Sequence, residues 1–257
     1  MFRSHPPRET VMNPADLLTI AAALGAGAFT KGVTGMGLPL VSLPFLVWFL
    51  GLPHALCVLV VPILVTNAWQ VWRFRASAAA HRLNFLRIAI FASFIGMAAG
   101  TYALTAVDER LLVLALAGVI FAYVGLRLLR PDFVLGPQTA ARIACPVGFA
   151  AGALQGATGI SAPVAATYVH AMRLEHGAHV YALSWLFLAV TAMQVVALGA
   201  AGILRWEWLA EGVFALLPVA LAMPLGHRLA ARLDRRTFDR VILAMLAVIG
   251  LYLALDP

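Results

Sequence analysis

The sequence has few charged residues for its length. Of its 257 residues, 11% are charged and 63% are hydrophobic, whereas soluble domains carry about 25% charged residues. A soluble fold of this size needs a larger polar surface, so the composition excludes a disordered chain and argues against an ordinary soluble enzyme. The mean hydropathy of +0.93 points the same way. We therefore expect an all-α polytopic integral membrane protein.

Cysteine and lysine are equally scarce. The two cysteines, Cys57 and Cys145, lie in apolar runs without a CxxC spacing, which predicts neither a disulfide nor a zinc site and favours burial of both. Lys31 is the one lysine among 18 basic residues, and the others are arginines in short connecting stretches. Without a dense basic run, the net charge of +7 predicts no nucleic-acid partner. Arginines beside apolar runs are instead topology signals.

The sequence also lacks the motifs of common enzyme classes. It contains no HExxH, no GxSxG and no GxxxxGK. Its 11 carboxylates fall in tails, in connecting stretches or at the ends of apolar runs, and they include Glu207 and Glu211. We therefore expect no catalytic residue, no metal, no cofactor, and no carboxylate proton relay in the middle of a membrane.

Ten apolar runs follow a polar N-terminal tail of residues 1–13. Six are long enough, or nearly so, to cross a bilayer, which takes about 20 residues; they span 55–72, 85–105, 111–126, 180–201, 209–225 and 241–255. Four are shorter and form pairs around residues 31–37 and 155–161; they span 14–30, 38–50, 143–154 and 163–172. The pattern predicts six full spans plus two broken or re-entrant helix pairs, about eight membrane segments.

The two interruptions are copies of each other. Residues 31–39 read KGVTGMGLP and residues 155–163 read QGATGISAP, an offset of 124 positions. The same offset, without a gap, aligns Gln70 with Gln194. A match of this length predicts an internal duplication, with a first membrane repeat at 14–130 and a second at 131–257, which together form a single domain.

Arginine placement predicts how the repeats lie in the membrane. The stretches 73–87, 127–142 and 227–240 are rich in arginine, whereas 103–110 and 202–211 are weakly acidic. Cytoplasmic loops carry the excess of basic residues, so we place the first three inside and both termini outside. Because the offset aligns basic stretches with acidic ones, the repeats are predicted to be inverted. The alternative is two parallel halves, each with one long helix kinked at its motif.

The duplicated breaks are candidate anion sites. Non-helical backbone at membrane depth survives only where it is buried or lines a wet cavity, and a helix N-terminus favours an anion. Pro39 and Pro163 suit the first turn of the following half-helix, where a missing N–H costs nothing. The predicted substrate-binding residues are Lys31, Gly32, Thr34, Gly35, Gly37, Asn67, Gln70, Gln155, Gly156, Thr158, Gly159, Ser161 and Gln194.

Each part of this site has a structural alternative. The glycines can serve only close helix packing, and Asn67 can serve only as an interhelical hydrogen-bond partner. Lys31 can extend to the membrane interface instead of facing the site.

The motifs resemble those of the TauE/SafE sulfite-exporter family of membrane transporters. The matching segments are GVTGMGLP at 32–39, PILVTNAWQ at 62–70 and GATGISAP at 156–163, and the resemblance covers about residues 17–255. It implies transport of a small sulfur-containing or organic anion, such as sulfite, sulfoacetate or a sulfonate, across the bacterial inner membrane. The alternative is a membrane accessory or assembly subunit without transport activity. The sequence leaves the oligomeric state open.

Overall fold

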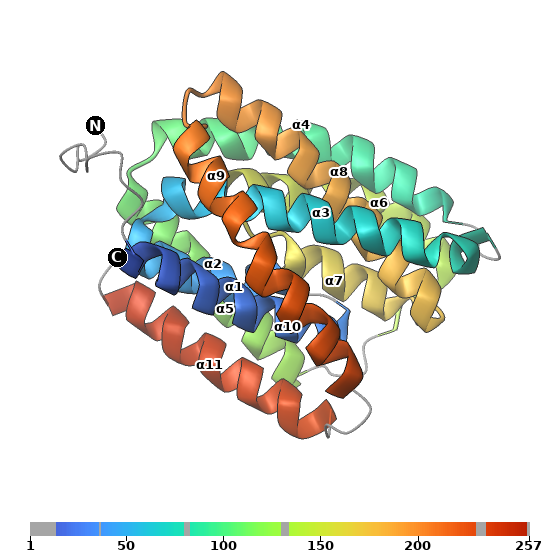
Figure 1. Ribbon diagram of the computed structural model, residues 1–257. Coiled ribbons are helices and arrows are strands. Elements are labelled where there is room, and N and C mark those ends of the chain that lie inside the picture. Colours follow the sequence, from blue (N-terminus) through green and yellow to red (C-terminus); the bar gives the residue numbers. More distant parts are fainter. Residues whose placement is uncertain (1–13, 36, 80–82, 130–133, 230–234, 256–257) are drawn as a thin grey trace.

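The computed structural model describes residues 14–35, 37–79, 83–129, 134–229 and 235–255, and the predicted tail at 1–13 lies outside this part. Every regular element among these residues is an α-helix (Figure 1). The helices are α1 (Pro14–Thr34), α2 (Leu38–Leu50), α3 (Leu52–Ala79), α4 (Asn84–Ala106), α5 (Glu109–Leu129), α6 (Pro137–Thr158), α7 (Ala162–Ala171), α8 (His176–Ala200), α9 (Trp206–Phe214), α10 (Leu216–Leu229) and α11 (Arg235–Leu255).

Six segments of the described chain are long and apolar enough to cross a membrane, which confirms a helical, multi-pass membrane protein. They lie in α1, α3, α4, α5, α8 and the continuous stretch of α9 with α10. Two shorter apolar helices cover 38–50 and 243–255. The predicted number of six is met, and it includes α1, which we had counted among the short runs; the run at 241–255 lies in α11, a helix of 21 residues.

The first helix of each predicted short pair is longer than its apolar run. α1 has 21 residues and α6 has 22, because the helix continues through the Lys31 and Gln155 positions. Helical geometry ends only where a glycine adopts a left-handed conformation, at Gly35 (φ 82°) and Gly159 (φ 76°). The helices are therefore interrupted only between Thr34 and Leu38 and between Thr158 and Ala162, which is shorter than the seven-residue segments that we predicted.

Both prolines lie where the sequence predicts them. Pro39 and Pro163 occupy the first turn of α2 and α7, where the proline ring removes no intrahelical hydrogen bond. The helix ends also repeat along the chain. α1 and α6 end 124 residues apart, α2 and α7 begin 124 residues apart, and so do α3 and α8.

Two glycine-lined helix pairs hold the bundle together, α4 with α6 and α1 with α10. A Cβ atom on Gly100 of α4 would lie 2.1 Å from the carbonyl oxygen of Ala153. A Cβ atom on Gly226 of α10 would lie 2.2 Å from the carbonyl oxygen of Phe29. Small residues let helix backbones approach this closely in membranes. Phe29 and Ala153 are 124 positions apart and the two glycines 126, so the contacts join corresponding helices with a shift of two residues, and each packs a helix of one half on a helix of the other.

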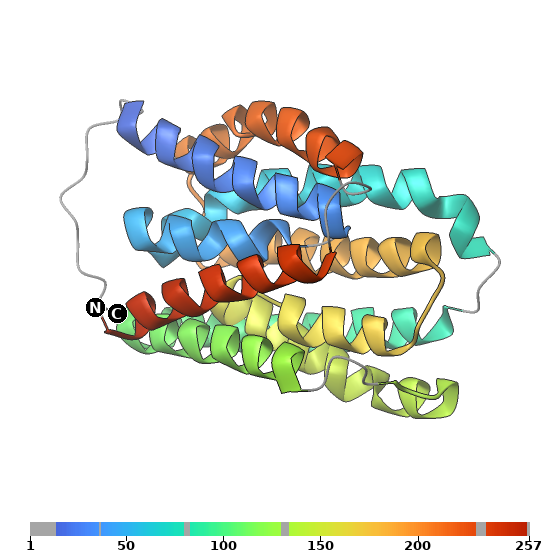
Figure 2. The same ribbon diagram turned by 90° about the horizontal axis from the view of Figure 1, so that it is seen from below.

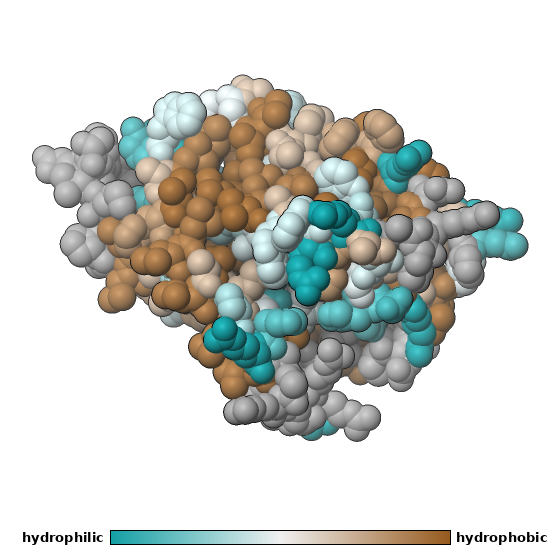
Figure 3. All heavy atoms as spheres, turned by 45° about the vertical axis from the view of Figure 1, so that its right-hand side comes forward, coloured by the Kyte–Doolittle hydropathy of each residue, from teal (hydrophilic) through white to brown (hydrophobic). Residues whose placement is uncertain are grey.

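The helices run roughly side by side along one direction, and α1 begins at the end of the bundle where α11 finishes (Figure 2). One flank of the molecule is broadly apolar, with hydrophilic side chains gathered toward one end (Figure 3). Large exposed side chains include Trp69, Phe91 and Leu217, as expected for a surface that contacts lipid.

One buried position was predicted wrongly. Cys57 is buried, but Cys145 is exposed on α6. A bilayer accommodates an apolar thiol as well as a protein core does, so the usual preference of cysteine for burial decides nothing on a lipid-facing helix.

Candidate functional site

Each break lies against a long helix of the opposite half. A Cβ atom on Gly35 would lie 3.1 Å from the side chain of Val180 in α8, and one on Gly159 would lie 2.2 Å from Leu56 in α3. Leu56 and Val180 are 124 positions apart, so these two contacts are equivalent. The breaks are thus enclosed by protein, as non-helical backbone at membrane depth requires.

Lys31 lies in the last turn of α1, and its ammonium group points into the protein. The side chain is 3% exposed. Nζ donates hydrogen bonds to Asn67 Oδ1 (2.5 Å) and Thr66 Oγ1 (3.1 Å), both on α3. Thr66 in turn donates to the carbonyl oxygen of Pro62 at 2.7 Å. Lys31 therefore does not extend to the interface, and Asn67 is its direct partner.

No carboxylate balances this charge among the described residues. Lys31 has only neutral oxygen partners in the part of the chain that the structure describes. Transfer of an unpaired ammonium group out of water is unfavourable by several kcal/mol. A buried lysine in a membrane span is by default a functional group, and here it is one whose natural complement is an anion.

The equivalent position in the second half is neutral. Gln155 Nε2 donates to Gln194 Oε1 at 2.9 Å, and Gln194 Nε2 donates to the backbone oxygen of Gln155 at 3.3 Å. Ser161 Oγ donates to Gln155 Oε1 at 2.7 Å. All three side chains are buried. The second break therefore contains a closed network of two amides and a hydroxyl group, all three among the predicted substrate-binding residues, but no charge.

Gln70 joins the first break to the second half. Its Nε2 donates to the carbonyl oxygen of Gly35 at 3.2 Å, and its Oε1 accepts from Ser184 Oγ of α8 at 2.9 Å. The carbonyl groups at a helix C-terminus have no intrahelical partner, and water does not reach them inside a bilayer. Gln70 supplies such a donor to Gly35, whereas Gln194 is a second donor to the carbonyl oxygen of Gln155, which already accepts from the backbone N–H of Gly159.

The threonine hydroxyl groups act differently from the prediction. Thr34 Oγ1 donates to the carbonyl oxygen of Thr30, and Thr158 Oγ1 donates to that of Leu154. Both hydroxyl protons are bonded within their own helix, a common arrangement for threonine in apolar helices. They are not directed at a ligand in this structure, so their predicted role as donors requires a change of rotamer.

The motif glycines divide into two groups. Gly32 and Gly156 are packing positions, since a Cβ atom there would lie 2.1 and 2.6 Å from the carbonyl oxygens of Met223 and Met97. Gly35, Gly37 and Gly159 have positive φ angles, which residues other than glycine rarely adopt. Gly37 is also the N-cap of α2, and neither it nor Ser161 of α7 makes a side-chain capping hydrogen bond.

Sequence reasoning missed Thr66 and Ser184. Each is a hydroxyl residue inside an apolar run, and Thr66 is adjacent to Asn67, which was selected. That adjacency is the signal that could have identified it. Ser184 has no counterpart at the offset of 124, where Val60 stands, so the duplication could not have identified it.

Sequence reasoning also missed a hydrogen-bonded histidine–glutamate pair between two helices. Glu211 lies inside α9 and is 8% exposed, although we expected the carboxylates to lie in connecting stretches or at the ends of apolar runs. Its Oε2 lies 2.5 Å from His54 Nε2 of α3. Among the described residues, no group of three or more His, Cys, Asp or Glu side chains could hold a metal ion.

Comparisons with known proteins identify the family. The family model described as Sulfite exporter TauE/SafE matches residues 19–253, nearly the whole chain. Neither the curated proteins nor the solved structures gave a match.

Proposed function

Because the chain belongs to the Sulfite exporter TauE/SafE family, we propose that it is a secondary transporter for a small sulfur-containing or organic anion of the sulfite, sulfoacetate or sulfonate class. The family is one of membrane transporters and not of enzymes. The bacterial inner membrane is the location that this function implies.

The observation that carries the proposal is the buried Lys31. Burial of its ammonium group destabilises the protein, because two neutral oxygens compensate the charge only in part. A bound anion would complete that compensation. The group lies one turn before the left-handed Gly35 and therefore next to the break. A membrane scaffold needs only the small-residue contacts and gains nothing from a buried cation whose partners are neutral.

The helix starts after the breaks add the second component. The first N–H groups of a helix lack intrahelical partners and carry a partial positive charge. α2 and α7 both begin directly after a break without a side-chain cap. Discontinuous helices whose N-termini point at an anion are a recurring transporter arrangement. We propose one anion between these starts, near Lys31 on one side and the Gln155 network on the other.

We further propose that the two repeats, 14–130 and 131–257, are inverted in the membrane. The helix boundaries and the glycine contacts that recur at 124 residues support a twofold relation. In Figure 2, the equivalent helices α3 and α8 run in opposite directions, and so do α5 and α11, which favours the inverted arrangement over the parallel one. Two inverted halves around one site supply the two states of alternating access.

The pairs α1–α2 and α6–α7 are consistent with re-entrant pairs, in which a long helix enters the membrane and a shorter helix leads back to the same side. α2 has 13 residues and α7 has 10, which at 1.5 Å per residue extend over about 20 and 15 Å. The hydrocarbon core is about 30 Å thick, so neither helix crosses it alone. The start of each helix is thereby at membrane depth, where an anion site between the repeats needs it.

The test is flux in proteoliposomes that contain this protein alone. Labelled sulfite, sulfoacetate and a simple alkanesulfonate are offered in turn, and protein-free liposomes give the background. We expect saturable flux of at least one of these anions, competed by the others and weakened in Lys31→Met. Absence of flux for all three, with folded protein in the vesicles, refutes the proposal and favours an accessory subunit.

A further inference from the structure

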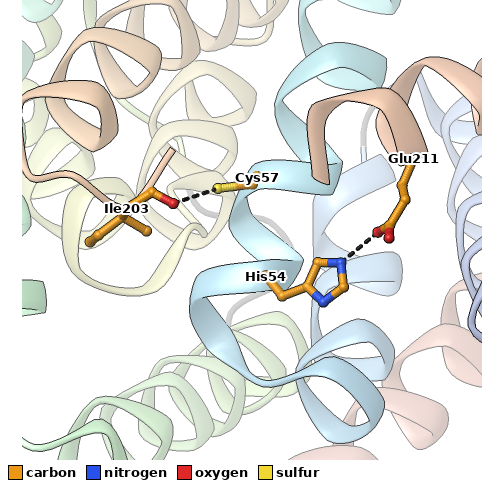
Figure 4. Close-up of polar contacts among 4 residues, drawn as sticks. All are labelled: His54, Cys57, Ile203 and Glu211. Carbon is orange, nitrogen blue, oxygen red and sulfur yellow. Dashed lines mark hydrogen bonds and ion pairs between the residues drawn. The ribbon is translucent and has the colours of Figure 1, made fainter. Parts of the chain in front are cut away.

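A second buried polar pair lies away from the breaks, between α3 and α9. His54 and Glu211 point toward each other across the two helices (Figure 4). Their side chains are 16% and 11% exposed, and the indole of Trp208 stacks on the His54 ring with centroids 4.6 Å apart. A carboxylate and an imidazole, both able to bind a proton, are thus in hydrogen-bond contact between two candidate membrane spans.

Helix packing does not require this pair. α3 packs on α9 as its equivalent α8 packs on α4. At the offset of 124, however, His54 corresponds to Ala178 and Glu211 corresponds to the exposed Arg87. The equivalent interface therefore forms without a histidine–glutamate pair, although an acidic residue in a membrane span is costly and is retained chiefly where it has a function.

The pair fixes a short helix that leads to the candidate anion site. α9 ends at Phe214 and α10 begins at Leu216, and Ala215 between them keeps a right-handed helical conformation, so α9 runs on into α10. On the near side, Gly212 brings α9 against α3, because a Cβ atom there would lie 2.5 Å from the carbonyl oxygen of Val58. On the far side, α10 packs directly on Gly32, the residue after Lys31.

We propose that His54 and Glu211 form a proton-binding site that couples anion transport to proton movement, an inference that rests on the proposed transport function. One proton from the aqueous phase binds to the Glu211 carboxylate, forms an O–H bond and removes one negative charge. The attraction of the carboxylate for His54 is then weakened, and α9 is held on α3 chiefly by packing. Because α9 continues into α10, this change reaches α1 and the break beside Lys31.

Other charged groups near the pair are few among the described residues. Arg205 precedes α9 and lies over the Trp208 ring at 5.1 Å, and Glu207 is exposed in the first turn of α9. Glu109 of α5 accepts a hydrogen bond from the backbone N–H of Leu52, two residues before His54. Lys31 is engaged with Asn67, more than three helical turns further along α3.

The experiment compares two fluxes of labelled sulfite in the same proteoliposomes. One is exchange at equal pH on both sides, and the other is accumulation driven by a pH gradient. For Glu211→Gln and His54→Gln, we expect the ratio of gradient-driven accumulation to exchange to fall at least tenfold, with Glu211→Asp partly restoring it. Sulfite itself titrates near neutral pH, so the result is read from the difference between each variant and the wild type under identical conditions.

Glu207→Gln is the matched control, because it removes an exposed carboxylate four residues from Glu211 on the same helix, and both of its fluxes should equal those of the wild type. If the Glu211 variants exchange sulfite and keep the wild-type ratio, the pair is only structural and the coupling proposal is wrong. If the wild type exchanges neither sulfite nor a sulfonate, the transport proposal fails and this inference fails with it. If Glu211→Gln does not fold, His54→Gln decides between these outcomes by the same ratio.

Discussion

Replacement of Lys31 by methionine is the sharpest test of the anion site. Methionine keeps the length of the apolar stem and removes the ammonium group. A hydrogen bond to a charged group contributes about 1.5–3 kcal/mol, so loss of Lys31 should weaken anion binding by about 10- to 100-fold. The two neutral partners, Thr66 and Asn67, cannot replace the charge.

The effect of this substitution on stability should be much smaller. The Asn67 oxygen loses the Nζ donor, which costs about 1–3 kcal/mol for a buried acceptor. Removal of a buried ammonium group that no carboxylate balances offsets that loss. We therefore expect a melting temperature close to that of the wild type, which separates loss of affinity from loss of folding.

Equilibrium binding of labelled sulfite to purified protein measures the first effect, and thermal unfolding followed by tryptophan fluorescence measures the second. Arg142→Met serves as the control, because it removes one positive charge at an exposed position of α6 and should leave affinity unchanged. If Lys31→Met binds sulfite within twofold of the wild type, Lys31 does not contact the anion. If Arg142→Met weakens binding equally, the effect is one of net charge and not of the site.

Three further predictions concern packing and topology. Gly159→Ala places a side chain at a φ of 76° and 2.2 Å from Leu56, so strain of about 1–2 kcal/mol should lower the melting temperature and the flux. Gly100→Ala brings a Cβ atom to 2.1 Å from a backbone oxygen of α6 and should cost about 1–3 kcal/mol as overpacking, again read as a lower melting temperature. Gly118→Ala, which meets no atom within 4 Å, is the control for both, and an equal loss there would contradict the packing argument. A cysteine at Ala76, in a chain whose Cys145 is changed to serine, should react with a membrane-impermeant maleimide from the cytoplasmic side, and labelling from the outside alone would rule out the proposed orientation.

The sequence was sufficient to predict an all-helical membrane protein and the positions of its two breaks. Both rest on strong local signals, namely long apolar runs and a glycine motif that occurs twice. It was insufficient for the helix ends, because Lys31 and Gln155 have good helix propensity and continue the helices that we had ended before them. Whether such a residue ends a helix depends on the conformation of the next glycine, which composition does not reveal.

The sequence could predict the candidate site only as a set of polar residues around two matching motifs. It could not predict which of them contact one another. Gln155 contacts Gln194, whereas the matching Lys31 and Gln70 contact Asn67 and the Gly35 backbone instead. The contact of Gln70 with Ser184 and that of His54 with Glu211 join residues 114 and 157 positions apart. Pairs that are unrelated by the internal repeat leave no periodic signal in one sequence, and only the packing of the helices brings them together.

The crossed packing of the two halves bears on how the chain is made. α1 leaves the ribosome long before its main packing partner, α10, which begins at Leu216. Throughout synthesis of the intervening segments, the buried face of α1, with Gly32 and the charged Lys31, therefore has no native α10 surface to cover it. α6 can pack on α4 as soon as it is made, so the α4–α6 pair can form before the α1–α10 pair. Assembly is thus expected to be late and cooperative, and α1 depends on the insertion machinery or on an interfacial position until the second half is nearly complete.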